Sequence, residues 1–406
     1  MTTWRIAWRN LWRNKRRTVL ALAAIALSVT LVLLYDGILR GYSEWMVETI
    51  TGPMLGHAQV HAPEWRDTRA MDRTLPHVGR TLDAIRRQPG VTGAEARVYA
   101  PALAAVRTDG FAVFVLGLDM AAESRPGRLL AGATPPPAGQ VLMGHLLATQ
   151  MHVKPGDVIA IVGQGADGSM ANDLFTVAGL VSTSVDFANR EAILMPIDLA
   201  RELFVMQDEA HEIVVYASDP EQAPAMARAL GALPDLAGTE VLDWKALAPE
   251  LVDILNLYAS VWIFVLLLVL IAAVAGIANT MLMATYERTH ELGMLLALGT
   301  APGRVVVMIA LEALVLGLLG AIAGTVIGGS LVAWGHHTGV DYAALTGGGP
   351  SEIAVLGLNW SLSFYPSLAV IDIVRVVAAV VITSLLASAW PAIRSARLEP
   401  ARALWE

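Results

Sequence analysis

Four long apolar runs constrain this chain more than any other feature of its sequence. They occupy residues 18–40, 254–286, 305–335 and 367–393. A helix needs about 20 apolar residues to cross the roughly 30 Å hydrocarbon core of a bilayer, and each run is long enough. Hydrophobic residues make up 55% of the chain and charged residues only 16%, whereas an ordinary soluble domain is about 25% charged. We therefore predict an α-helical membrane protein with four transmembrane helices.

The charges of the loops predict the orientation of these helices. Residues 1–17 and 394–406 are rich in arginine, whereas residues 336–366 contain neither lysine nor arginine. Because basic loops stay in the cytoplasm, we expect both termini and the loop 287–304 to be cytoplasmic and residues 41–253 and 336–366 to lie outside. The alternative of a cleaved signal peptide is disfavoured, because the first run is longer than a signal core of about 7–15 residues.

The N-terminal segment, residues 1–17, has an amphipathic pattern. Trp4, Trp8, Leu11 and Trp12 recur at helical spacing, so a helix would place them on one face. Arginines fill the adjacent face, and tryptophan is favoured at the level of the lipid headgroups. We predict an interfacial helix that contacts membrane lipid; the alternative is a plain basic anchor.

Residues 41–253 are numerous enough to form a domain with its own core. Their mixed pattern predicts a large α/β domain between the first and second transmembrane helices, with two subdomains joined by a proline-rich linker near residues 132–139. Residues 39–51 and 244–256 look helical and would extend the adjacent spans as stalks. The other predicted elements are strands at 56–62, 94–107, 111–118, 157–163, 174–182 and 212–217, and helices at 78–88, 144–151 and 221–231.

Motifs for catalysis or cofactor binding are weak or missing. Residues 163–168 match G-x-G-x-x-G, but they lie between two strand-like runs, so we expect a hairpin loop and not a dinucleotide site. No G-x-x-x-x-G-K-[ST] occurs, so the chain cannot bind ATP through a P-loop of its own. The chain has no cysteine and a net charge of −8, which disfavour thiolate chemistry and nucleic acid as a partner. His57 and His61 lack a third ligand nearby, so we expect no metal site. We also expect no catalytic residues, because neither G-x-S-x-G nor H-E-x-x-H occurs.

Polar and small residues inside the spans need their own explanation. An ionised Glu312 would cost roughly 2.5–3.5 kcal/mol in the membrane, so it should face the bundle, either neutral or paired with Asn279 or Thr280; a proton relay is the alternative. We expect two local ion pairs near the outer ends of their spans, Asp36 with Arg40 and Asp372 with Arg375. A four-residue spacing of small residues predicts close packing within the chain, with a seam between two copies as the alternative: Gly317, Gly320, Gly324 and Gly328.

The cytoplasmic loop carries the most informative pattern. Residues 279–304 read NTMLMATYERTHELGMLLALGTAPGR, and Glu287 and Glu291 share one face of a short helix. This segment resembles the coupling-helix signature of FtsX-like ABC transporter permeases, the type VII or mechanotransmission family. The tail PAIRSARLEPARAL at 391–404 resembles the C-terminal motif of the same family. The resemblance covers most of the chain. It is nearest to the lipoprotein-releasing (LolC/LolE-type) branch, which GHAQVH at 56–61 and DWK at 243–245 resemble.

The resemblance implies a non-catalytic subunit in the bacterial inner membrane. Two copies of an ABC ATPase would dock beneath a pair of permeases, either identical or paralogous, and ATP and Mg would bind in the ATPase. The coupling helix would span residues 286–298, and the residues implied in ATPase coupling are Glu287, Arg288, Glu291, Gly293, Leu298 and Gly299. The residues implied to line an opening for an acylated substrate are Leu31, Leu34, Ile38, Leu255, Tyr258 and Trp262.

Several functions stay open at this point. The leading hypothesis is a permease that extracts or transports lipoproteins or other amphipathic cargo. A second is a MacB-like export permease that works with a periplasmic adaptor. A third is an FtsX-like scaffold that activates a cell-wall hydrolase, and a fourth is a four-span receptor without an ATPase, against which the coupling motif argues.

Overall fold

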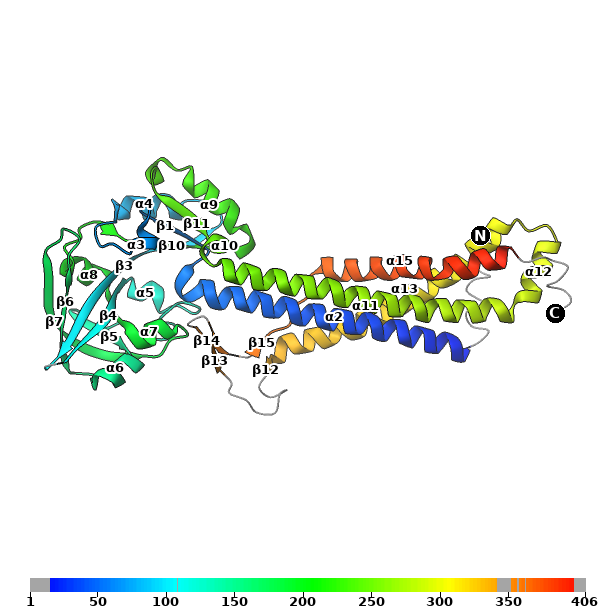
Figure 1. The fold of residues 1–406 in the computed structure, drawn as a ribbon, viewed down its shortest axis with the longest axis horizontal. Coiled ribbons are helices and arrows are strands. Elements are labelled where there is room, and N and C mark those ends of the chain that lie inside the picture. Colours follow the sequence, from blue (N-terminus) through cyan, green and yellow to red (C-terminus); the bar gives the residue numbers. More distant parts are fainter. Residues whose placement is uncertain (1–14, 108, 342–351, 356–357, 362, 398–406) are drawn as a thin grey trace. The chain divides into compact units, whose positions relative to one another are not determined.

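The computed structural model describes residues 15–107, 109–341, 352–355, 358–361 and 363–397 (Figure 1). Most of the predicted interfacial segment (residues 1–14) and half of the C-terminal motif (residues 398–404) fall outside these residues. The chain divides into two compact units. The helical unit comprises Met1–Glu44, Ile254–Asp341 and Ser363–Glu406, and the α/β unit comprises Trp45–Asp253 and Tyr342–Leu362.

The described residues contain four helices long and apolar enough to cross a membrane. In Figure 1 they run alongside one another, and their facing side chains form a shared apolar core. The four are α2 (Lys15–Ile50), α11 (Pro249–Glu287), α13 (Pro302–Thr338) and α15 (Val370–Ala396). The helical unit also holds the short helix α12 (Thr289–Ala297) and two short strands, β12 (Val340–Asp341) and β15 (Ser363–Phe364).

The first two spanning helices continue past the apolar runs. Helix α2 extends to Ile50 and ends in the π-helical turn η1 (Thr51–Leu55). Helix α11 begins at Pro249, directly after the short helix α10 (Trp244–Leu247). Proline suits the first turn of a helix, because the N–H that it lacks would have no partner there. The predicted stalk at 244–256 is therefore two helices with a break at Ala248.

The α/β unit is built mainly on one nine-stranded sheet, in the order β11-β1-β10-β3-β4-β8-β5-β7-β6. Its strands are β1 (Ala58–His61), β3 (Val91–Val106), β4 (Asp109–Leu118), β5 (Gln140–Gly144), β6 (Val158–Gln164), β7 (Met170–Val181), β8 (Ala192–Pro196), β10 (Glu212–Ala217) and β11 (Glu240–Asp243). Smaller strands are β2 (Leu75–Pro76), β9 (Glu209–Ala210), β13 (Glu352–Val355) and β14 (Leu358–Ser361). Its other helices are α3 (Trp65–Thr68), α4 (Val78–Arg86), α5 (Met120–Glu123), α6 (His145–Met151), α7 (Asp186–Glu191), α8 (Ile197–Leu203), η2 (Pro220–Gln222), α9 (Ala223–Gly231) and η3 (Pro234–Leu236).

An additional pairing closes part of this sheet into a ring. Strand β3 pairs with β4 along most of its length and also with β6, from Ala102 opposite Gly163 to Ala105 opposite Ala160. Strands β3, β4, β8, β5, β7 and β6 therefore form a closed circuit, with parallel pairs at β4–β8 and β5–β7. Closure removes the unpaired edges that an open sheet would expose.

Two hydrophobic cores share the long strand β3. One fills the ring and includes Val98, Val115 and Val141. The other lies under β1, β10 and the first part of β3, where α4 and α9 cover the sheet. The expectation of a subdomain linker at residues 132–139 is corrected here, because β4 before it and β5 after it belong to the same core. The two cores are divided along β3 instead.

The hairpin predictions are confirmed. The strands predicted at 94–107 and 111–118 pair as the hairpin of β3 and β4, and Asp109 and Gly110 open β4 opposite Val106 and Ala105. The G-x-G-x-x-G segment connects the antiparallel strands β6 and β7, and Gly168 adopts a positive φ of 82° that suits glycine. No helix begins within this loop, so the arrangement that binds a dinucleotide phosphate is missing.

Candidate functional site

The predicted coupling segment folds as a short helix between two spanning helices. Glu287 ends α11, Arg288 forms the turn, and α12 follows from Thr289 to Ala297. The helix stops before Gly299, whose positive φ of 87° closes the end of the segment. The helix begins three residues later and ends one residue earlier than the predicted range of 286–298.

One face of α12 is anchored to the bundle. Leu292 and Gly293 are buried, and Leu292 packs with Val305, Ile309 and Ala392. The opposite face is exposed, and it carries apolar side chains where solvent-facing charges would be usual: Met294, Leu295 and Leu298, the last with 78% of its surface accessible. Of these three, only Leu298 was predicted from the sequence to take part in ATPase coupling. An exposed apolar cluster is typical of a surface that binds another protein.

Arg288 joins the coupling segment to the membrane span α13. Its Nη1 donates to both carboxylate oxygens of Glu312, at 3.0 and 3.2 Å, and its Nε donates to Glu291 Oε2 at 3.2 Å. The partner of Glu312 is therefore Arg288, where the sequence suggested Asn279 or Thr280. The Thr280 hydroxyl donates to the carbonyl of Gly276 within α11, and Asn279 lies exposed on the same helix.

The glycine ridge of α13 lies against other helices of the same chain. A Cβ added to Gly320 would lie 2.6 Å from Ile25 of α2, and one added to Gly324 would lie 2.6 Å from the Ala26 carbonyl oxygen. Gly328 also faces α2, while Gly317 faces Ser384 of α15. The ridge therefore brings three helices of one bundle close together.

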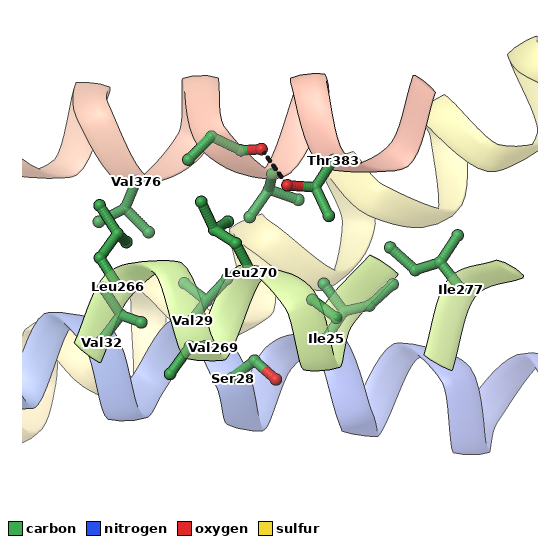
Figure 2. A pocket seen from close by; sticks show the side chains of 13 residues that line it. Ile25, Ser28, Val29, Val32, Leu266, Val269, Leu270, Ile277, Val376 and Thr383 are labelled. Atoms are coloured by element: carbon green, nitrogen blue, oxygen red, sulfur yellow. Dashed lines mark hydrogen bonds between the residues drawn. The ribbon is translucent and has the colours of Figure 1, made fainter. Parts of the chain in front are cut away.

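An apolar cleft opens between α2, α11 and α15 (Figure 2). Figure 2 shows Val29 and Val32 on α2 facing Leu266 and Leu270 on α11, with Val376 on α15. The cleft volume is about 20 Å³, which is close to the space that one water molecule needs. The full lining is Ile25, Ser28, Val29, Val32, Leu266, Val269, Leu270, Ala273, Ile277, Val376, Ala379, Val380 and Thr383.

The residues predicted to line an opening lie on the same two helices as the cleft, α2 and α11, but none of the six lines it. Leu31 is exposed, and Leu34, Ile38, Leu255, Tyr258 and Trp262 are half-buried. The Tyr258 ring meets the Tyr42 ring edge-on, with centroids 5.8 Å apart.

The charged residues near the end of α2 and the start of α15 form an ion pair between the two helices. Arg40 Nε donates to Asp372 Oδ2 at 2.9 Å, which replaces the expected local pair of Arg40 with Asp36. Arg375 lies 3.6 Å from Asp372, as the spacing predicted. The Asp372 carboxylate also accepts the Ala369 N–H at the start of α15. Helices α2 and α15 are thus linked by an ion pair that sequence spacing could not show.

A buried arginine joins the end of α2 to the sheet of the α/β unit. Arg97 on β3 donates to the carbonyl oxygens of Met54 at 2.6 Å and Pro53 at 3.2 Å. It also donates twice to Glu123 Oε1, at 3.0 and 2.6 Å. These contacts satisfy carbonyl groups at the C-terminal end of the helix, where a cation is favourable. The Glu123 carboxylate holds the pKa of Arg97 above its usual value even though the group is buried.

Comparison with known families decides the identity of the chain. The FtsX-like permease C-terminal family matches residues 263–400, and the MacB-like periplasmic core domain matches residues 18–233. The chain belongs to the FtsX-like and MacB-like ABC transporter permeases. This permease is 23% identical to the lipoprotein-releasing system transmembrane protein LolC of Neisseria meningitidis, over 95% of this chain and 93% of that protein. It is 24% identical to LolC of Xylella fastidiosa, over 95% and 92% of the two chains.

A solved structure also resembles the permease over part of its length. The periplasmic region of MacB from Actinobacillus actinomycetemcomitans matches with 12% identity and a TM-score of 0.35, over 50% of this chain and 96% of that chain.

Sequence reasoning did not find two sets of residues around the coupling segment. Met294 and Leu295 read as an ordinary apolar stretch, and only their exposure sets them apart. Arg394 lies in the family-like tail motif, but its position over the Tyr286 ring, 4.9 Å from the centroid, depends on how α15 packs beside α11. In this permease the coupling segment is held by contacts to α13, through Arg288 and Glu312, and to α15, through Leu292 and Ala392.

Proposed function

We propose that this permease moves lipid-anchored or amphipathic cargo from the outer face of the bacterial inner membrane. Its power source is a pair of separate ABC ATPase subunits, and a second permease, identical or paralogous, completes the complex. The observation that carries the proposal is the apolar cleft between α2, α11 and α15, whose lining suits an acyl chain and offers little to a polar solute. Similarity to LolC over nearly the whole chain supports lipoprotein as the cargo class.

The packing of α11 supports a cleft that opens. In the most apolar 18-residue stretch of α11, only 6% of the residues are buried within the chain, whereas 56% are buried in the corresponding stretch of α13. Helix α11 can therefore shift with little loss of internal packing, whereas α13 is fixed by its glycine contacts. A cleft of about 20 Å³ is too small for an acyl chain, so the described arrangement corresponds to a closed state.

The charges of the loops indicate on which side of the membrane each part of the permease lies. With both termini in the cytoplasm, α12 faces the ATPases and the α/β unit lies outside. Closure of the ATPases would press on α12, and the Arg288–Glu312 pair would pass that displacement to α13. The cargo is moved on the outer side and need not cross the membrane.

A bulky substitution in the cleft tests the proposal. Leu270 lines the cleft, whereas Leu267, one turn away on α11, is exposed. We expect Leu270→Trp to block release of a fluorescent triacylated lipoprotein from proteoliposomes, and Leu267→Trp to leave release intact. Both variants should still co-purify with the ATPase, which shows that they fold and assemble. Equal release from the two variants would remove the cleft from the mechanism.

The MacB-like core domain favours one second candidate, export with a periplasmic adaptor. Native mass spectrometry of the tagged permease in mild detergent separates the two. Lipoprotein release predicts a complex with two ATPases and a bound acylated protein. Export predicts an adaptor in the same complex, and a complex without ATPase would contradict both.

A further inference from the structure

The α/β unit contains a second cavity, separate from the membrane cleft and of different chemistry. Its volume is about 300 Å³, at the lower end of the range typical of sites for small molecules. Its lining combines charged, polar and aromatic groups: Met54, Leu55, Gln59, Arg66, Arg69, Tyr99, Pro101, Phe114, Phe187 and Glu212. The cargo function proposed above does not use this cavity.

Two arginines from one short segment give the cavity its cationic side. Arg66 lies within α3, and Arg69 caps that helix in the left-handed conformation, with φ of 51°. The Arg69 guanidinium stacks over the Trp65 ring, 4.3 Å from its centroid, which fixes its position. Arg66 Nη2 donates to the Leu247 carbonyl at 3.3 Å, which leaves its other N–H groups for a ligand.

Among the described residues that line the cavity, Glu212 is the acid that faces these two cations. Glu212 is 3% exposed, and its Oε1 lies 3.5 Å from the Tyr99 hydroxyl and 4.0 Å from Arg97 Nη1. Burial raises the pKa of Glu212 to about 7, although Arg97, Arg69 and Arg66 each act to lower it. Arg97 is already paired with Glu123. The wall of the cavity is therefore net positive whether or not Glu212 is ionised.

The remaining wall is mostly apolar and partly aromatic, with polar groups from Gln59 and Tyr99. Phe114 on β4 and Phe187 on α7 meet edge-on, with centroids 5.2 Å apart. Met54 and Leu55 come from η1, the turn that ends α2, and Arg97 bonds the Met54 carbonyl. A ligand with an apolar body would therefore contact both the sheet and the end of the helix that continues from the first span.

We propose that this cavity binds a small amphipathic carboxylate, with its anionic head against Arg66 and Arg69 and its apolar body against Phe114 and Phe187. Arginine suits this role because its planar fork matches the two oxygens of a carboxylate. In its protonated form Glu212 can donate a hydrogen bond to the same head group. A cationic ligand would meet two arginines and is disfavoured.

Binding of naphthalene-1-acetate to the full chain in lipid nanodiscs tests the proposal. This probe is water-soluble and carries one carboxylate on an aromatic body. From its size we expect a Kd of roughly 0.1–1 mM, measured by saturation-transfer NMR or calorimetry. The amide and the ethylammonium analogues keep the aromatic body without the negative charge, and we expect each to bind at least about tenfold more weakly. Equal binding of the three probes would overturn the proposal.

Variants place the probe in the cavity. Arg66→Gln with Arg69→Gln should weaken the binding of naphthalene-1-acetate by about 10- to 100-fold. Arg87→Gln with Arg228→Gln removes the same charge from exposed sites elsewhere in the unit and should leave the affinity unchanged. Glu212→Gln keeps the shape and removes the like charge, so at pH 8 it should tighten binding about 3- to 10-fold. A misfolded protein could not give that gain. Unchanged affinity in the Arg66/Arg69 variant would overturn the proposal.

Discussion

Arg288 at the start of the coupling segment donates to both oxygens of Glu312 in the membrane span α13, at 3.0 and 3.2 Å. Glu312 is buried, and Arg288 is only partly exposed. The pair therefore has two effects. It neutralises an acid that would be costly inside the membrane, and it ties the segment expected to meet the ATPase to the most tightly packed helix of the bundle.

The first prediction concerns this pair. Glu312→Gln removes the charge but keeps the shape, so we expect assembly with the ATPase to persist while thermal stability falls. Arg288→Gln should destabilise as well, and the double variant should lose less than the sum of the two. A coupling energy of about 1–3 kcal/mol is expected, because the residues share one contact. Thermal unfolding of all four proteins in nanodiscs measures it, and strict additivity would show that the pair contributes nothing.

The second prediction concerns the docking surface on α12. Glu287 is exposed at the end of α11, close in sequence to the exposed apolar side chains of α12. We expect Glu287→Lys to reduce ATPase co-purification by about tenfold, as for a reversed charge in an interface. Glu250→Lys makes the same change at the other end of α11 and serves as the control. Reversal of Glu291 as well should abolish docking, but Glu291 also holds Arg288, so the single change is the cleaner test. Undiminished co-purification would remove Glu287 from the interface.

The third prediction compares two glycines of α13, Gly324 and Gly329. A Cβ at position 324 would lie 2.6 Å from the Ala26 carbonyl oxygen, whereas one at position 329 meets nothing within 4 Å. We expect Gly324→Ala to destabilise the bundle by about 1–3 kcal/mol, because α2 must move away. Gly329→Ala should be neutral or stabilising by up to about 1 kcal/mol, because alanine favours the helix. Thermal unfolding in the same lipid compares the two, and equal effects would contradict close packing at this ridge.

The fourth prediction is a pH dependence of the α/β unit. Neither ring nitrogen of His61 has a hydrogen-bond partner among the described residues, and Nδ1 lies 3.2 Å from Glu240 without the geometry of a bond. Burial, together with the charges of Arg66 and Arg69, lowers the pKa of His61 to about 4. The Glu240 carboxylate is 41% exposed, so water screens its attraction.

The sign of the effect follows from linkage. Above the unfolded pKa of about 6.5, His61 is neutral in both states and contributes nothing to the pH dependence. As pH falls from about 6.5 to 4, only the unfolded chain takes up the proton, so stability drops by up to about 3 kcal/mol. His61→Phe should flatten this part of the curve. A variant whose unfolding shows the same acid dependence would assign the effect to other groups, such as His57 and His211, whose pKa values are also lowered by burial.

The sequence predicted what depends on local pattern. The four spans stand out by hydropathy, and the hairpin of β3 and β4 by two adjacent strand-like runs. Pairings between distant segments carry no such signal. The contact of β3 with β6 closes the ring, yet nothing in the alternation of either strand specifies it. The proline-rich segment near 132–139 is a surface connection within one core, because composition marks a loop but not what the loop separates.

The candidate sites show the same division. The coupling motif located α12 within three residues, but the partner of Arg288 depends on how α13 packs beside it. Arg40 was assigned to Asp36, one turn away on the same helix, whereas in the bundle it reaches Asp372 on α15. The cavity in the α/β unit could not be predicted from the sequence for a similar reason, since its arginines and aromatic rings come from four separate elements.

The pairing of β3 with a strand far along the sequence also has a consequence for how the chain is made. Strand β3 must wait for β10, which is synthesised about 100 residues later. At about 5–20 residues per second, that delay lasts on the order of 5–20 s. During this time the edges of an unfinished, alanine- and valine-rich strand stay open, while the first span is already able to enter the bilayer. Ribosome pausing or a holding chaperone in this interval would therefore affect the yield of the permease without any change in its final stability.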